Sequence, residues 1–145
     1  MEEKINHLLL SLDWNCSEEE QKRAIQELIT YKEVLVDSII TSTDKYQWPN
    51  VIKFIGLLDK KDQVKFVPQM LFLLQDMNWP GALDATELMV RLSHTELKPH
   101  ISRALTDADK EKDTIWIAWI KAFLDKAEMN DLLIEYKDIL DKAEW

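Results

Sequence analysis

A repeat with a period of 31 residues is the feature of this sequence that most constrains its fold. Residues 66–76, FVPQMLFLLQD, align without a gap with residues 97–107, LKPHISRALTD, and Pro68 then stands opposite Pro99. Four aspartates that each follow an apolar run are separated by 31, 32 and 31 residues: Asp13, Asp44, Asp76 and Asp107. Because one such period has room for two helices of about 10 to 14 residues, the repeat predicts a solenoid of stacked helical hairpins.

The spacing of apolar residues and the capping residues predict where these helices lie. Ser17, followed by three glutamates, is a favourable N-cap for the second helix. The sequence thus predicts an all-α fold, an α-α superhelix of about four hairpins plus a C-terminal capping helix, as a single domain over residues 1–145. The expected helix pairs are 2–12 with 17–30, 33–41 with 49–58, 67–75 with 80–92 and 99–105 with 113–124, followed by the capping helix 128–143.

The stretch LQDMNWPGA, residues 74–82, is expected to be a turn between two helices. Asp76 can accept hydrogen bonds from backbone N–H groups of the turn, Asn78 can cap the next helix, and Pro80 suits its first turn. Trp79 is then expected to be buried in the seam between hairpins. A similar Trp-Pro pair, Trp48 with Pro49, is expected to open the second helix of the preceding hairpin.

The composition is that of a globular helical protein. Hydrophobic residues make up 46% and charged residues 31%, and two glycines with four prolines leave little material for β-turns. No apolar run approaches the roughly 18 residues of a membrane span, and the first residues lack the basic segment of a signal peptide. We therefore expect a cytoplasmic protein without a membrane partner.

The net charge of −9 is concentrated at the two ends of the chain. Residues 1–37 carry nine acidic and four basic side chains, residues 125–145 carry seven and three, and the middle carries eleven of each. An acidic chain repels phosphate backbones and anionic lipids, so the charge disfavours nucleic acid and membrane surfaces and favours a basic protein as partner. Solubility alone is the simpler explanation of the charge.

The sequence contains no recognisable catalytic or cofactor motif, so we expect no enzyme, no cofactor and no metal. The histidines His7, His94 and His100 fall in three separate segments, without the i,i+4 spacing of a helical metal site. Asp84 and Glu87 form an i,i+3 carboxylate pair, which could act as an acid/base dyad but more often is a solvated helix face. Trp116 and Trp119 lie on an almost entirely apolar helix and are expected in the core rather than around a ligand.

Two family resemblances follow from these motifs. Pro68, Asp76 and the apolar positions from Leu71 to Leu92 resemble HEAT-type repeats, although the arginine that usually follows the aspartate is absent. LQDMNWPGA together with DTIWIAWIKAFL, residues 113–124, resembles a bacterial family known as domain of unknown function 5071. The latter resemblance covers residues 59–124 and implies an α-α superhelix without a known activity.

Two functions from different classes remain open. The first is a non-catalytic protein-binding HEAT-like module, expected to be monomeric, such as an immunity or antitoxin-like inhibitor of a basic bacterial toxin. Its expected partner-binding residues are Trp48, Trp79, Asp84 and Glu87, on the face formed by the second helices. The alternative is a nucleic-acid base-excising hydrolase on a HEAT-like solenoid, which would require a basic groove for phosphates.

Overall fold

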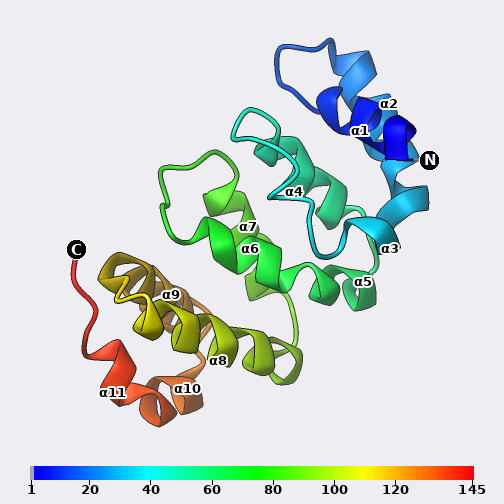
Figure 1. Cartoon of the computed structure of the whole chain (residues 1–145). Helices are drawn as coiled ribbons and strands as arrows, with labels where there is room; N and C mark the ends of the chain where they lie inside the picture. The colour runs from blue at the N-terminus through cyan, green and yellow to red at the C-terminus, as the bar shows by residue number, and fades with distance from the viewer. Residues whose placement is uncertain (1) are drawn as a thin grey trace.

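The computed structural model describes residues 2–145, and this part of the chain consists of helices and turns without a β-strand (Figure 1). The all-α prediction is therefore confirmed. The helices are α1 (Glu2–Leu10), α2 (Glu18–Leu28), η1 (Ile29–Tyr31, a 3₁₀ helix), α3 (Lys32–Leu35), α4 (Trp48–Gly56), α5 (Lys60–Lys65), α6 (Val67–Leu73), α7 (Ala82–Val90), α8 (His94–Lys110), α9 (Thr114–Lys126), α10 (Asn130–Glu135) and α11 (Lys137–Leu140).

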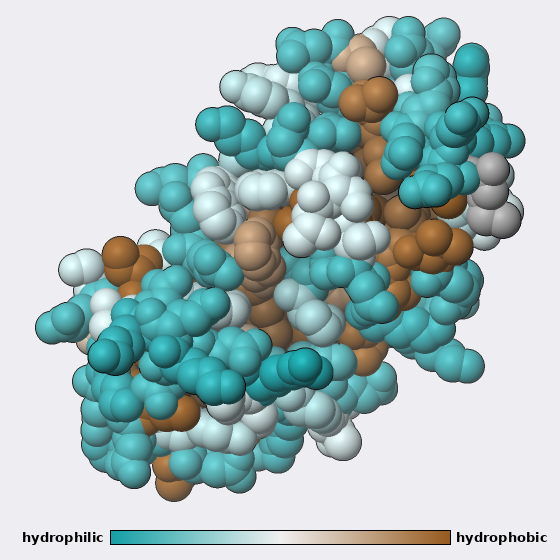
Figure 2. Space-filling model, viewed as in Figure 1, coloured by the Kyte–Doolittle hydropathy of each residue, from teal (hydrophilic) through white to brown (hydrophobic). Residues whose placement is uncertain are grey.

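Neighbouring helices along the chain pack as pairs, and the pairs follow one another in sequence order (Figure 1). Helix α1 contacts α2, α6 contacts α7, and α8 contacts α9. The second helices also contact one another in order, α2 with α4, α4 with α7 and α7 with α9, while α10 and α11 pack on α9. Each pair is thus covered by the next, and Figure 2 shows apolar residues in seams between polar surfaces as well as a few that protrude at the surface.

Three of the four repeated aspartates make the same turn. Oδ1 of Asp13, Asp44 and Asp76 accepts the backbone N–H of the residue two positions later, at 2.8, 2.9 and 2.9 Å. This side-chain bond closes a turn that mimics a backbone turn. The fourth expected turn is wrong, because Asp107 lies inside α8 and the chain turns only after Lys110.

Helix α8 is longer than the expected 99–105 because its apolar stripe extends beyond Pro99 and Asp107. The buried side chains Leu97, Ile101, Leu105 and Ala108 follow the helical period. Pro99 therefore lies inside the helix rather than at its start. The second helix of this pair begins where expected, since the Asp113 carboxylate caps α9 by accepting the Trp116 N–H at 3.0 Å.

Two further helices are shorter than expected. In place of a helix over 33–41, α3 ends at Leu35, and the Gln69 side chain bonds to the following backbone, accepting from Ile40 N at 2.9 Å and donating to Asp37 O at 3.1 Å. These bonds satisfy backbone groups that a longer helix would have paired. The expected 128–143 helix is divided into α10 and α11 at Tyr136, whose φ of −104° and ψ of 23° are not helical.

Gly81, not Asn78, is the N-cap of α7, which begins at Ala82. Its φ of 89° lies in the left-handed region, and a Cβ at this position would lie 3.2 Å from the backbone C and O atoms of Trp48. The turn after Asp76 thus approaches the start of α4 so closely that only glycine fits. The expected cap was wrong because Pro80 lies in the turn, before the helix, rather than in its first turn.

Substitution of the two glycines tests this close approach. Gly81→Ala should lower the free energy of unfolding by about 1–2 kcal/mol or more, because a side chain is strained at this φ and meets rigid backbone. Gly56→Ala is the matched control, since its Cβ would meet only the end of the flexible Leu88 side chain, at 3.3 Å. Urea unfolding of both variants measures the difference, and equal midpoints would contradict the close approach.

An ion pair connects two layers on the side of the molecule away from these turns. Lys32 Nζ lies 2.7 Å from Asp62 Oδ2, and Lys65 Nζ lies 3.4 Å from Asp62 Oδ1 and 3.1 Å from Glu33. The Asp62 side chain is only 12% exposed. The hydrogen bond from Lys32, assisted by Lys65, holds the pKa of Asp62 below its ordinary value although burial opposes this shift.

This lowered pKa predicts a pH-dependent contribution to stability. The contribution is fully present above the pKa of an unfolded aspartate, about 3.9, and is lost as the pH falls through the lower folded value. Asp62→Asn should therefore lower the melting temperature most at neutral pH and least in acid. Asp141→Asn, which removes the exposed pair with Lys137, is the control and should change the melting temperature little. A pH-independent difference for Asp62→Asn would contradict the expectation.

Candidate functional site

The three turns closed by aspartate lie along one edge of the molecule (Figure 1). We call residues 11–17, 41–47 and 74–81 together the turn edge. The first two turns are joined directly, because the Trp14 N–H donates to Tyr46 O at 3.2 Å and the two rings stack with centroids 6.0 Å apart. The third turn approaches the start of α4 closely at Gly81, which has no Cβ to meet the Trp48 backbone.

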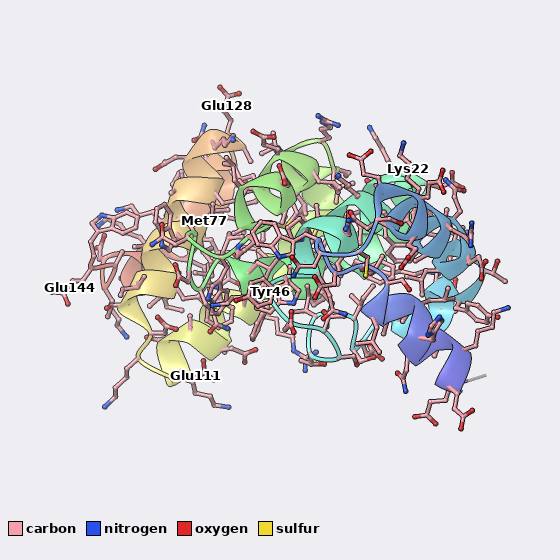
Figure 3. All side chains as sticks on the ribbon, turned by 90° about the horizontal axis from the view of Figure 1, so that it is seen from above. Lys22, Tyr46, Met77, Glu111, Glu128 and Glu144 are labelled. Atoms are coloured by element: carbon pink, nitrogen blue, oxygen red, sulfur yellow. The ribbon has the colours of Figure 1, made fainter. Side chains whose placement is uncertain are left out.

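Large aromatic side chains are exposed on this edge. Trp14 is 64% exposed and Tyr46 is 46% exposed. Figure 3 shows Tyr46 near the middle of the molecule, between Lys22 toward the N-terminal end and Met77 toward the C-terminal half. The two stacked rings together form an exposed apolar patch on the turn edge.

A second aromatic group joins the third turn to the core. The Trp79 ring makes an edge contact with Trp48 at 5.3 Å and stacks on Phe72 at 5.8 Å. The indole N–H of Trp48 donates to Ile40 O at 3.4 Å. Trp79 packs in the seam as expected, but it is only partly buried, because one part of its ring remains at the surface.

A pocket of about 360 Å³ lies between these two aromatic groups. Its apolar lining comes from all three turns and the start of α4: Trp14, Tyr46, Pro49, Trp79 and Pro80. Lys45 and Asn78 complete the lining. The Lys45 ammonium lies 5.7 Å from the centroid of the Tyr46 ring, within the range of a cation–π contact.

The four expected partner-binding residues do not lie together in the structure. Trp48 and Trp79 contact each other, and Trp79 lines the pocket. Asp84 and Glu87 are exposed on α7 and are not among the pocket's lining residues. Trp14 and Tyr46 were not predicted as site residues, although each lies one or two positions after a repeated aspartate and such positions fall in exposed turns.

A larger hollow, of about 700 Å³, lies between α2 and α4. Its charged lining is mixed, with Glu18 opposed by Lys22 and Lys53. Asn50, also in the lining, is already engaged, since its Nδ2 donates to Leu12 O at 2.7 Å and to Gln21 Oε1 at 2.9 Å. These polar groups join the two layers, so the aromatic pocket is the stronger candidate for a ligand site.

Two titratable side chains outside the ion pairs have shifted pKa values. Burial, together with Glu20 and Asp13, raises the pKa of the Cys16 thiol and keeps it protonated at neutral pH. Burial and the nearby Arg103 lower the pKa of His100, which lines a hollow of about 210 Å³ with Phe72 and Trp116. Both shifts favour the neutral form of the side chain.

Within residues 2–145, no three histidine, cysteine or acidic side chains lie close enough together to hold a metal ion. None of the helices described there is both long and apolar enough to cross a membrane.

Comparison with known proteins identifies the family. No curated protein and no solved structure matches the chain. A family model described as Domain of unknown function (DUF5071) matches residues 43–141, which include most of the second turn, the third turn and α4 through α11. Since this match spans more than half of the chain, the protein belongs to the DUF5071 family.

Proposed function

We propose that this protein is a non-catalytic protein-binding module whose hairpins form a HEAT-like α-α superhelix. The contacts between successive second helices support such a stack, as does the recurrence of one aspartate turn at 31 and 32 residues. Bonds between layers recur at similar separations, from Lys32 to Asp62 and from Asp109 to Lys142. A solenoid of this kind offers extended surfaces to other macromolecules.

The exposed aromatic rings of the turn edge carry the proposal of protein binding. Tryptophan and tyrosine are enriched at the centres of protein interfaces, because one side chain buries a large apolar area and still offers a hydrogen-bond donor. Trp14 and Tyr46 expose such area next to a pocket that Trp79 also lines. The three turns that present these rings are fixed by hydrogen bonds, so binding would require little ordering.

The charge of the chain favours a basic partner. The net charge is −9, and the acidic segments at both ends would speed the approach of a cationic protein. An immunity or antitoxin-like inhibitor of a basic toxin fits this chemistry, and Asp84 and Glu87 on α7 would then contribute to steering. The base-excising hydrolase is the weaker alternative, because the hollow between α2 and α4 mixes Glu18 with Lys22 and Lys53 instead of presenting a basic groove.

A capture experiment tests whether the aromatic turn edge is the interface. The tagged protein is used to recover partners from a native lysate, in parallel with the double variant Trp14→Ala/Tyr46→Ala. Because central aromatic residues each account for more than about 1 kcal/mol of binding, the double variant should reduce recovery of the specific partner by about tenfold or more. Trp145→Ala is the matched control, since Trp145 is 76% exposed but lies at the C-terminal end, in edge contact with Trp119.

Equal recovery by the double variant and the control would place the interface elsewhere. Failure of the unaltered protein to retain any specific partner would contradict the proposed function itself.

Charge reversal on α7 tests the steering contribution separately. Asp84→Lys with Glu87→Lys should leave the melting temperature nearly unchanged, because both side chains are exposed. The double reversal should slow association with a basic partner and flatten its dependence on salt, with little effect on dissociation. Stopped-flow or surface-based kinetics measure both rates. An unchanged association rate would mean that the charges on α7 do not affect the approach of the partner.

A further inference from the structure

We infer that the aromatic pocket of the turn edge binds a proline-rich segment in the polyproline II conformation, flanked by lysine or arginine, from the partner protein. This inference rests on the proposed protein-binding function and adds the chemistry of the ligand.

The lining of the pocket suits proline rings. Trp14 and Tyr46 line it from the first two turns, and Trp79 and Pro80 line it from the third. Flat aromatic and prolyl surfaces face a space of about 360 Å³, which is small for a folded element but sufficient for a few side chains of an extended peptide. Aromatic-lined grooves of this type recognise polyproline II segments because the ligand is already stiff and loses little entropy on binding.

The hydrogen-bonding groups of the pocket also fit such a segment. Within residues 2–145, the indole N–H groups of Trp48 and Trp116 donate to backbone carbonyls of the chain, whereas those of Trp14 and Trp79 do not. Lys45 and Asn78 add further donors to the lining. A polyproline II helix has no internal hydrogen bonds, so its carbonyl groups are free to accept from these donors.

The lining offers an ordinary extended peptide few acceptors, since the Asn78 amide oxygen and the Tyr46 hydroxyl are the side-chain acceptors among its residues. Such a peptide presents backbone N–H groups as well as carbonyls, and no carboxylate lines the pocket. Proline lacks the N–H group, so a proline-rich segment leaves no donor unsatisfied. A lone cation in the pocket is disfavoured for the same reason, and because the Lys45 ammonium already lies over the Tyr46 ring.

Charges around the pocket determine the flanks of the ligand. The turn edge contains three carboxylates, Asp13, Asp44 and Asp76, and one ammonium, Lys45. The carboxylates accept backbone N–H groups at their own turns. Residues that extend from the prolines beyond the pocket therefore meet a net negative rim, which favours lysine or arginine.

Calorimetric titration with a synthetic peptide tests this inference directly. The probe is an oligoproline with an arginine at each end, and the control peptide keeps both arginines but replaces the prolines with glycine and serine. We expect saturable binding of the proline peptide and none of the control peptide. Absence of saturable binding by the proline peptide, or equal binding of both peptides, overturns the inference.

Substitutions of tryptophan test whether the proline peptide binds in the pocket. Trp14→Ala should weaken binding of the proline peptide by at least about tenfold, the scale of a central aromatic anchor, whereas Trp145→Ala should leave it unchanged. Trp14→Phe retains a ring and loses the donor, and should weaken binding by about threefold to tenfold. Circular dichroism confirms that each variant is folded, and unaltered binding by both Trp14 variants overturns the assignment of the pocket.

The outcome separates this inference from the proposed function. If the proline peptide does not bind while capture of a partner still depends on Trp14 and Tyr46, only the inferred ligand chemistry fails. If no partner is captured at all, the proposed function fails independently of the peptide result.

Discussion

The aspartate that closes each of three successive turns is the interaction on which the arrangement of the turn edge depends. In every case the carboxylate accepts the N–H two residues later, which turns the chain toward the next helix. Because this turn recurs at 31 and 32 residues, the three turns come to lie along one edge (Figure 1). The residues just after each aspartate are held outside the helices, and there Trp14 and Tyr46 are exposed while Trp79 bridges surface and core.

Each layer completes the hydrogen bonding of the layer before it. The carbonyls of Leu9 and Leu12, at and beyond the end of α1, accept from the side chains of Gln47 and Asn50 at 2.6 and 2.7 Å. The Leu71 carbonyl in α6 accepts the buried indole N–H of Trp116 at 3.0 Å. The Leu9 and Leu71 carbonyls also accept backbone N–H groups, from Leu12 and Leu74, so the side-chain bonds from the next layer add to those within each hairpin. The same stacking brings turns from three hairpins close enough to share one pocket.

The sequence predicted features that depend on local chemistry. The Ser17 cap, the Asp76 turn and the start of α9 follow from residues within a few positions of one another, and the structure confirms them. Features that depend on contacts between layers could not be predicted from residues that are close together in the sequence. After Leu35 the chain is not helical, and its backbone is bonded instead by the side chain of Gln69, which lies far along the sequence. The close approach of Gly81 to Trp48 likewise moves the start of α7 to a later residue than expected.

For the candidate site, too, some residues could be predicted from the sequence and others could not. Trp48 and Trp79 could be selected because Trp-Pro recurs in the sequence, and the structure brings them into contact. Asp84 and Glu87 were selected from their spacing on a helix. That spacing predicts that both side chains are exposed, but it does not predict that they lie outside the lining of the pocket. Trp14 and Tyr46 meet only because a backbone bond joins two turns, a contact that no short motif encodes.

The central claim is that ligands bind at the turn edge, and the indole N–H signals of the six tryptophans offer the most direct measurement. In a ¹H–¹⁵N spectrum recorded during titration with a captured partner, the signals of Trp14 and Trp79 should shift or broaden. The signals of Trp116, bonded to Leu71, and of Trp145 at the far end should not change. Shifts confined to Trp116, Trp119 and Trp145, with Trp14 and Trp79 unaffected, would contradict the account.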